Sequence, residues 1–171
     1  STSTVPDQSQ TTEQRWGSRE IEITDVSIRG VTGSAGHVFH TGEPVEIRLA
    51  YIAHGEFRDF VFGVGISTAE GILCYGTNTY LEHLEPDRIQ GDGEVLFAID
   101  RLQLLSGTYT LDVAVHKMDG YPYDYHRHRY TFRVKSRVND VGVYRPEHRW
   151  EFKGNVHFTL ATDETRRDLD S

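Results

Sequence analysis

Hydrophobic and polar residues alternate with a period of two along most of the middle of the chain. The alternation is clearest over residues 45–51 and 109–115, where Val, Ile, Leu and Tyr positions are separated by mostly polar or small residues. Successive side chains of a β-strand point to opposite faces of its sheet, so this pattern predicts half-buried strands. Similar short strands are expected at residues 21–26, 60–66, 75–79, 95–99 and 130–134.

Turn sequences separate these segments, and no long stretch has the 3.6-residue period of a helix. Glu70-Gly71 and Gly91-Asp92-Gly93 each precede an alternating segment, and residues 30–36 are rich in Gly and predict a loop. About seven or eight short strands with turns between them predict an all-β fold, an immunoglobulin-like antiparallel β-sandwich.

Residues 105–109 read Leu-Ser-Gly-Thr-Tyr and fit one detail of such sandwiches. A Tyr that follows a turn Gly at the start of a strand is typical of a tyrosine corner, in which the hydroxyl bonds back to a nearby backbone group. A Tyr109 that simply fills the core is the alternative.

Both ends of the chain are polar and aperiodic. Residues 1–18 are expected to be a flexible linker or tail, in which Trp16 is the exception because its bulky ring can dock on the domain edge. Residues 161–171 are charged and are expected to fray. The chain of 171 residues suits a single domain, which we place at residues 19–160.

The segment 141–152 is less regular than the other predicted strands and contains Pro146. It is expected to be an edge strand or an arm exchanged with a second copy of the chain. Tyr144, Trp150 and Phe152 carry too much aromatic surface to remain exposed, so we expect them at the interface of a homodimer.

The charge, the lack of long apolar runs and the cysteine count of the chain argue against several classes of function. Lys and Arg total 18 and Asp and Glu total 26, for a net charge of −8, which argues against a nucleic-acid partner held by its phosphates. No run approaches the roughly 18 apolar residues of a membrane span or forms a signal-peptide core. The single cysteine, Cys74, cannot form an internal disulfide, and a reducing compartment is expected.

Enzymatic and metal sites find little support, and we predict no catalytic residue, no cofactor and no metal. There is no Gly-x-Ser-x-Gly sequence, Cys74 lies in an apolar strand, and nothing pairs two carboxylates. His126-x-His128 places two imidazoles on one strand but lacks the following Glu of a cupin-type site, and His37 with His40 offers even less.

The strongest pointer is a resemblance. It is carried by Phe39-His-Thr-Gly-Glu-Pro-Val45, Val61-Phe-Gly-Val-Gly-Ile66, Gly76-Thr-Asn-Thr79, Leu102-Gln-Leu-Leu-Ser-Gly-Thr-Tyr109, Tyr123-Asp124 and His148-Arg-Trp150. In their order and spacing, residues 39–152 resemble the C-terminal carbohydrate-binding domain of the ATPase subunits of bacterial polysaccharide ABC transporters that export O-antigen.

The resemblance implies a sandwich that binds lipid-linked polysaccharide, often at its capped non-reducing end, without reacting with it. It also implies a dimer, in some members with an exchanged last strand, and a place in the cytoplasm, peripheral to the bacterial inner membrane. The implied protein partners are the ATPase domain and the membrane subunit of the transporter. This chain has no Gly-x-x-x-x-Gly-Lys-Ser/Thr loop, so ATP binding is not expected, and it is an excised domain or a stand-alone homologue.

Candidate sugar-binding residues follow from chemistry, because sugars pair with amides, carboxylates and guanidiniums and stack on aromatic rings. Gly63, Gly65 and Ser67 share one face of their strand and either clear space for a ligand or admit a partner subunit. Tyr75, Asn78 and Tyr80 lie nearby in the sequence. The alternative for Asn78 is a turn-stabilising role.

The segment 116–129 is the densest cluster of Tyr, Asp, His and Arg, and Asp119-Gly120 predicts a turn in it. We expect these side chains to form a saccharide rim at one end of the sandwich. The candidates are His116, Tyr123, Asp124, Arg127 and Arg129. The alternative is a solvated loop in which Asp124 pairs with Arg127 or Arg129.

The main hypothesis is therefore a non-catalytic module that tethers O-antigen polysaccharide for export. A structural dimerisation module of the transporter ATPase subunit and a metal-dependent β-sandwich enzyme are the alternatives.

Overall fold

A computed structural model describes residues 14–30 and 37–159, and these form nine β-strands. The strands are β1 (Arg15–Trp16), β2 (Ile21–Gly30), β3 (Val38–His40), β4 (Val45–Phe57), β5 (Val61–Thr68), β6 (Leu73–Asn78), β7 (Ile89–Ile99), β8 (Gly107–His116) and β9 (Pro122–Lys135). Each strand predicted from alternation between residues 21 and 134 is present. The short strands β1 and β3 were not predicted. The loop expected at residues 30–36 lies mostly outside the described residues.

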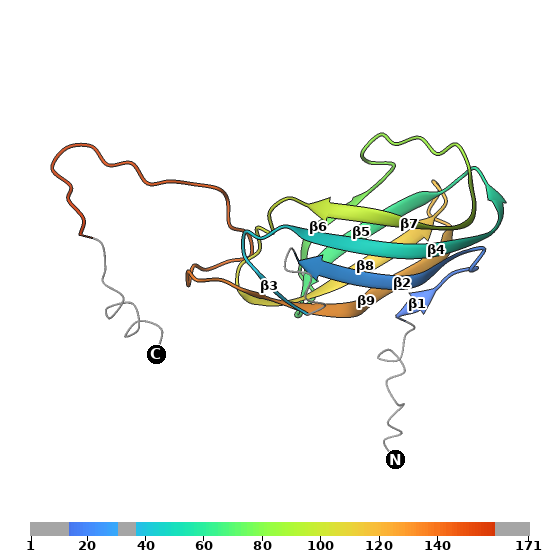
Figure 1. Ribbon diagram of the computed structural model, residues 1–171, viewed down its shortest axis with the longest axis horizontal. Coiled ribbons are helices and arrows are strands. Elements are labelled where there is room, and N and C mark those ends of the chain that lie inside the picture. The colour runs from blue at the N-terminus through green and yellow to red at the C-terminus, as the bar shows by residue number, and fades with distance from the viewer. Residues whose placement is uncertain (1–13, 31–36, 160–171) are drawn as a thin grey trace, which may run out of the picture.

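The strands form two sheets that face each other, as Figure 1 shows. Sheet A has six strands in the order β1-β9-β8-β5-β6, with β3 beside β9, and sheet B has three in the order β2-β4-β7. All neighbours are antiparallel except β3 and β9. The all-β antiparallel sandwich is confirmed.

The core lies between the inner faces of the two sheets. Ile47 and Leu49 of β4 belong to one buried cluster with Leu111, Val113 and Val115 of β8, and each is at most 2% exposed. Burying a side chain of this size stabilises the fold by about 1.5–3 kcal/mol. The inward positions alternate with outward ones, so the outer face of sheet A is left free for other roles.

The tyrosine corner is confirmed. The Tyr109 hydroxyl, in a side chain 3% exposed, donates to the Leu105 carbonyl at 2.7 Å. The Tyr109 ring also stacks on Phe132 of β9, with centroids 5.6 Å apart. The residue therefore serves both of the roles that the sequence left open.

The N-terminal boundary differs from the prediction. Arg15 and Trp16, expected in the linker, pair with His126 and Tyr125 of β9 and form the edge strand of sheet A. A polar tail forms a strand here because Asp124 is buried and requires a cation, which Arg15 supplies. Trp16 docks on the domain edge, as expected for its ring. Residues 1–13 lie outside the described residues.

The segment 141–152 is not a strand. Its start is held by an isolated bridge between Tyr144 and Leu104, with hydrogen bonds from Leu105 N to Val143 O and from Arg145 N to Gln103 O, both 2.9 Å. Beyond Pro146 the chain leaves the sandwich as an extended arm, residues 147–159 (Figure 1). The edge-strand prediction is wrong within one chain, because no strand of the chain's own sheets lies beside the arm.

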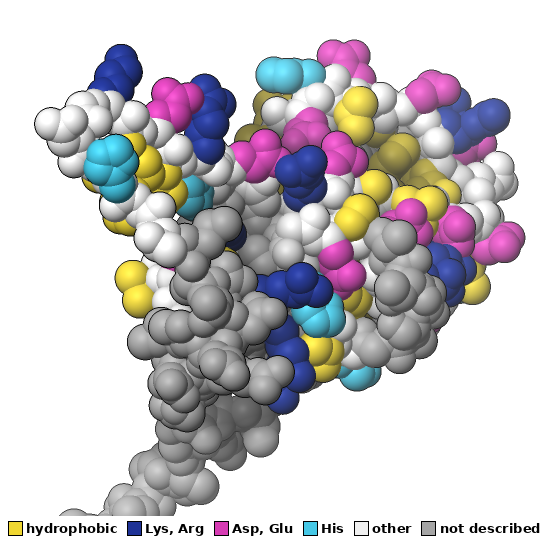
Figure 2. Space-filling view, turned by 60° about the vertical axis from the view of Figure 1, so that its left-hand side comes forward, with side chains coloured by type: hydrophobic (Ala, Val, Ile, Leu, Met, Phe, Trp, Pro, Cys, Tyr) yellow, Lys and Arg dark blue, Asp and Glu magenta, His cyan; other side chains and the backbone are white. Residues whose placement is uncertain are grey.

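The arm exposes its aromatic residues. Trp150 is 78% exposed and Phe158 is 72% exposed, and each ring packs against that of Phe152, also on the arm. Figure 2 shows the arm at its upper left, where hydrophobic side chains stand among charged ones without cover from the sandwich. The exchanged arm remains a prediction. The tail expected at residues 161–171 lies outside the described residues.

Candidate functional site

A row of five residues crosses the outer face of sheet A. In register from β1 to β6 the row reads Trp16, Tyr125, Ala114, Gly63 and Asn78. Residues directly opposite each other on neighbouring strands point to the same face, so these five side-chain positions share the outer face. The row has aromatic rings at one end, an amide at the other and almost no side chain between them.

The small residues in the middle of this face form the floor of a groove. A Cβ atom added at Gly65 would be 3.6 Å from the Asp112 Cβ, and one added at Gly76 would be 3.8 Å from the nearest atom, the Val64 carbonyl oxygen. A Cβ atom would therefore make only ordinary van der Waals contacts at either position, and its absence lowers the floor of the groove. The resulting groove has a volume of about 240 Å³.

Apolar and aromatic side chains form the two walls of the groove. On one side the Tyr125 ring lies parallel to that of Trp16, with centroids 4.5 Å apart and planes 12° apart. On the other side Leu73 and Leu81 are 66% and 61% exposed. Such surfaces suit the C–H faces of a sugar ring.

Three polar side chains line the same groove and have hydrogen-bonding capacity to spare. His116 Nδ1 lies 2.6 Å from the Lys117 carbonyl, so Nδ1 carries a proton and Nε2 of the neutral ring is an acceptor. Asn78 Oδ1 accepts from the Leu81 backbone N–H at 2.8 Å, which leaves its amide NH₂ as a donor. Asp112 Oδ1 accepts from the His128 N–H at 2.6 Å, which leaves Oδ2. Amide, imidazole and carboxylate groups match sugar hydroxyls.

A buried ion pair holds the aromatic wall in place. Asp124, 0% exposed, accepts from Arg15 Nε at 3.0 Å and Nη2 at 2.8 Å, and from the Ile23 backbone N–H at 2.8 Å. His126 Nε2 lies 3.1 Å from Asp124 Oδ1, an ion-pair distance without hydrogen-bond alignment. Tyr130 can donate to His126 Nδ1 at 2.7 Å, which puts the ring proton on Nε2, facing Asp124.

The charge state of Asp124 follows from these contacts. Burial alone raises the pKa of Asp124, but His126, Arg15 and the Ile23 N–H together outweigh burial and lower the pKa to about 2. The carboxylate is therefore charged at neutral pH and fixes Arg15. Because Trp16 follows directly in β1, the same pair positions Trp16 against Tyr125.

The structure separates the predicted sugar-binding residues into three groups. Asn78 and His116 line the groove, although Asn78 also has the turn-stabilising contact named as its alternative. Tyr75 and Tyr80 are exposed but do not line the groove. Arg127 and Arg129 are exposed on β9, beyond Tyr125.

The prediction that Tyr123 and Asp124 belong to a saccharide rim is wrong. They are 1% and 0% exposed, so neither can belong to a saccharide rim. There is no loop at these positions because β9 begins at Pro122, and a register shift opposite Val115 and His116 lets two successive side chains, Tyr123 and Asp124, both be buried. There the Tyr123 hydroxyl donates to the Asp59 carbonyl at 2.9 Å, and Asp124 pairs with Arg15 rather than with Arg127 or Arg129.

Sequence reasoning did not single out Tyr125, Asp112, Leu73 or Leu81 of the groove. The alternation places Asp112 on the solvent face of β8, but only the strand order and register bring it beside Gly65. Tyr125 reaches the groove because it pairs with Ala114, in the short regular stretch between two bulges of the β8–β9 ladder. A single sequence does not reveal such a register.

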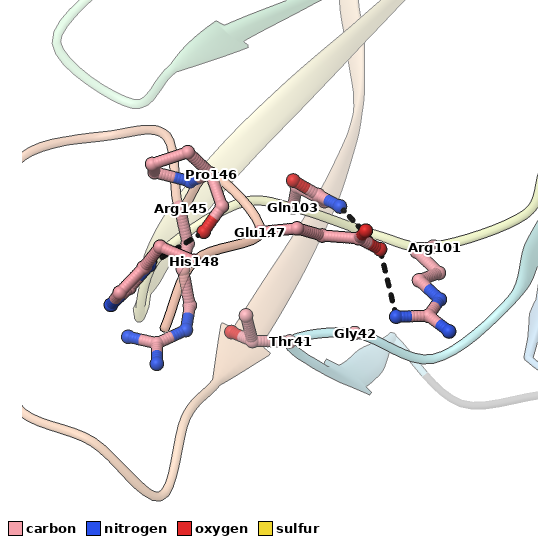
Figure 3. A pocket seen from close by; sticks show the side chains of 8 residues that line it. All are labelled: Thr41, Gly42, Arg101, Gln103, Arg145, Pro146, Glu147 and His148. Atoms are coloured by element: carbon pink, nitrogen blue, oxygen red, sulfur yellow. Dashed lines mark hydrogen bonds and ion pairs between the residues drawn. The ribbon is translucent and has the colours of Figure 1, made fainter. Parts of the chain in front are cut away.

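A second pocket, of about 410 Å³, lies where the arm leaves the sandwich (Figure 3). Its charged groups satisfy each other. Arg101 donates to Glu147 at 2.7 Å, Arg145 pairs with Asp140, and His148 Nδ1 bonds the Pro146 carbonyl at 2.8 Å. The groove on sheet A, whose polar atoms remain available, is therefore the better candidate despite its smaller volume.

Other chemistry has little geometric support. Within residues 14–30 and 37–159, no group of three or more His, Cys, Asp or Glu side chains could hold a metal ion. Burial raises the pKa of the Cys74 thiol, the opposite of what activates a nucleophile. No helix in the described part of the chain is long and apolar enough to cross a membrane.

Comparison with known proteins decides the family. The family described as "Wzt C-terminal domain" matches residues 12–146, a range that includes β1 and the whole groove. The chain belongs to the Wzt C-terminal domain family. A crystal structure of the C-terminal domain of Wzt has the same fold, with a TM-score of 0.75, 21% identity, and coverage of 81% of this chain and 87% of that one.

A longer relative gives the context of this Wzt C-terminal domain. The O-antigen export system ATP-binding protein RfbB of Myxococcus xanthus is 31% identical over 130 residues, which are 76% of this chain. The match spans 29% of the length of RfbB.

Proposed function

We propose that this Wzt C-terminal domain binds bacterial polysaccharide in the groove of sheet A and holds it without reacting with it. The observation that carries the proposal is the row Trp16, Tyr125, Ala114, Gly63 and Asn78, in which a flat, open floor lies between an aromatic wall and an amide. An extended sugar chain can lie on such a floor, stack on Tyr125 and form hydrogen bonds with Asn78 and His116.

The proposed ligand, partners and location are taken by analogy from the longer relative, RfbB. RfbB of Myxococcus xanthus is named as the ATP-binding protein of an O-antigen export system. By analogy, the ligand is lipid-linked O-antigen, and the protein partners are an ATPase domain and the membrane subunit of an ABC transporter. The domain would then work in the cytoplasm, peripheral to the inner membrane through the transporter.

A second candidate function, homodimerisation, rests on the arm. Trp150, Phe152 and Phe158 are all more than half exposed, and full burial of such rings would contribute several kcal/mol at about 25 cal/mol per Å². β7 is an edge strand of sheet B, and beside it an apolar groove of about 240 Å³ is lined partly by Leu84, Leu96 and Phe97. A partner's arm seated along β7 would cover both surfaces.

Substituting Gly65 tests polysaccharide binding. Gly65→Val adds apolar bulk to the floor at a position where a Cβ atom makes only ordinary contacts, and it should weaken binding of O-polysaccharide at least tenfold in calorimetric titration. Ala50→Val is the matched control, on the central strand and outer face of sheet B. Polysaccharide length should be unchanged after incubation. Equal binding by both variants and the parent would place the site elsewhere, and shortened chains would indicate catalysis.

A further inference from the structure

Four of the five exposed positions of β9 carry cations, and the first of them lies beside the groove. Arg127, Arg129, Arg133 and Lys135 are all exposed, and Arg127 lies two residues beyond Tyr125. They extend over nine residues, or at most about 27 Å of strand. We call these four residues the cationic strip.

The cationic strip is not neutralised within residues 14–30 and 37–159, where none of its four side chains forms an ion pair. Arg15, Arg48, Arg101 and Arg145, by contrast, each have a carboxylate partner. The carboxylate closest in register is Asp112, opposite the β9 bulge, and its Oδ1 is occupied by His128. The strip therefore presents free positive charge in a chain of net charge −8.

The outer face of sheet B has the opposite sign. The register of its three strands places five carboxylates on this face, and they outnumber its two arginines. The carboxylates are Glu22, Asp25, Glu46, Asp92 and Glu94, and the arginines are Arg29 and Arg48. The two outer faces of the sandwich thus differ in charge, and the positive one contains the groove.

We propose that the cationic strip binds anionic groups of the same polysaccharide that lies in the groove, so that the ligand of this domain is an acidic glycan bearing carboxylate or phosphate groups. This inference rests on the proposed function. A guanidinium binds carboxylate or phosphate through two parallel hydrogen bonds, and three of the four cations are Arg. A glycan is favoured over a membrane because the strip starts at the groove wall, where a bound chain would continue onto it.

The test compares one polymer in two charge states. Polygalacturonate oligomers and their carboxyl-reduced, neutral form are titrated into the full chain at about 50 mM salt and again at about 200 mM. We expect the acidic form to bind about tenfold more tightly at the lower salt, with the preference shrinking at the higher salt. Poly(glycerol phosphate) tests phosphate in the same way.

Variants assign the preference to β9. The triple variant Arg127→Gln, Arg129→Gln and Arg133→Gln should bind acidic and neutral polymers equally. Arg29→Gln, on the outer face of sheet B, is the matched control and should keep the preference. Circular dichroism and an unchanged melting temperature establish that the triple variant folds.

Three results would overturn the inference. The first is equal affinity of the parent chain for acidic and neutral polymers; if Gly65→Val still weakened binding of O-polysaccharide tenfold, the proposed function would stand without the strip. The second is no binding of either polyanion at the lower salt. The third is binding of vesicles of anionic phospholipid that depends on the strip while polygalacturonate does not bind, which would assign it to a membrane surface.

Discussion

Arg15 and Asp124, 109 residues apart in the sequence, form a two-point ion pair between the edge strand β1 and the buried start of β9. The Asp124 side chain is fully buried, whereas the Arg15 side chain is 20% exposed. The Asp124 carboxylate therefore needs Arg15 to compensate its buried charge, whereas the Arg15 guanidinium can still be solvated by water without Asp124.

Because of this ion pair, the free energy of unfolding should depend on pH in the acid range. The pKa of Asp124 is about 2 in the fold, below the value of about 3.9 in an unfolded chain, so its contribution is complete above about pH 5 and is lost as the pH falls toward 2. This contribution is about 2 kcal/mol. Asp124→Asn should lower the free energy of unfolding by about that much at pH 7 and flatten its decline between pH 5 and 2, measured by urea titration.

The control for that measurement is Asp25→Asn, because the Asp25 side chain is 64% exposed and its contact with Arg48 is 3.4 Å long. Its pH profile should match that of the parent chain. An Asp124→Asn profile as steep as the parent's would mean that other carboxylates govern acid unfolding.

Truncation tests whether β1 belongs to the domain. A chain that begins at Arg19 loses the Arg15–Asp124 pair at 2.8 Å and keeps the longer Arg19–Asp124 contact at 3.7 Å, so the loss is at most the roughly 3–5 kcal/mol of a broken buried pair. We expect its melting temperature to fall by about 6–15 °C, whereas a chain that begins at Gln14 retains every contact of β1 described above. Asp124→Asn in the shorter chain should recover part of the loss. Equal melting temperatures for the two truncations would contradict the role of β1.

The tyrosine corner makes a separate prediction about stability. Tyr109→Phe keeps the ring on Phe132 but leaves the Leu105 carbonyl without its donor, so unfolding should become easier by about 1–2 kcal/mol. Tyr121→Phe, at an exposed ring, should change stability by less than about 0.5 kcal/mol. Chemical denaturation of both variants measures the free energy of unfolding. Equal changes in the two variants would mean that the Tyr109 hydrogen bond does not stabilise the fold.

The arm predicts the oligomeric state. Deleting residues 148–171 removes Trp150, Phe152 and Phe158 but keeps the bridge between Tyr144 and Leu104 and the ion pair of Arg101 with Glu147. In light scattering at micromolar concentration we expect the full chain to be a dimer and the shortened chain a monomer. A monomeric full chain would exclude arm exchange, and a dimeric shortened chain would move the interface elsewhere.

Most of the fold could be predicted from the sequence because most of its strands have one solvent-exposed face and one buried face. Segments such as Val45–Tyr51 therefore carry a clear alternation, and a Tyr after a turn Gly marks the corner at Tyr109. The start of β9 hides the pattern, because Tyr123 and Asp124 are adjacent and both buried. β1 is invisible for another reason: two residues have no period, and the partner of Arg15 lies 109 positions away.

The groove was predictable only in part. Gly63 and Gly65 show from the sequence alone that one strand face lacks side chains. Which side chains surround that gap depends on strand order and on the bulge between Leu111 and Val113, neither of which is encoded locally.

The stacking of Trp16 on Tyr125 joins two processes in one thermodynamic cycle. Tyr125 touches β1 on one side and the groove on the other, so undocking of β1 and occupancy of the groove are coupled. A ligand that prefers docked β1 by some factor makes detachment of β1 harder by the same factor. Loss of β1 would in turn leave Tyr125 without the ring on which it stacks and so weaken whatever the groove binds.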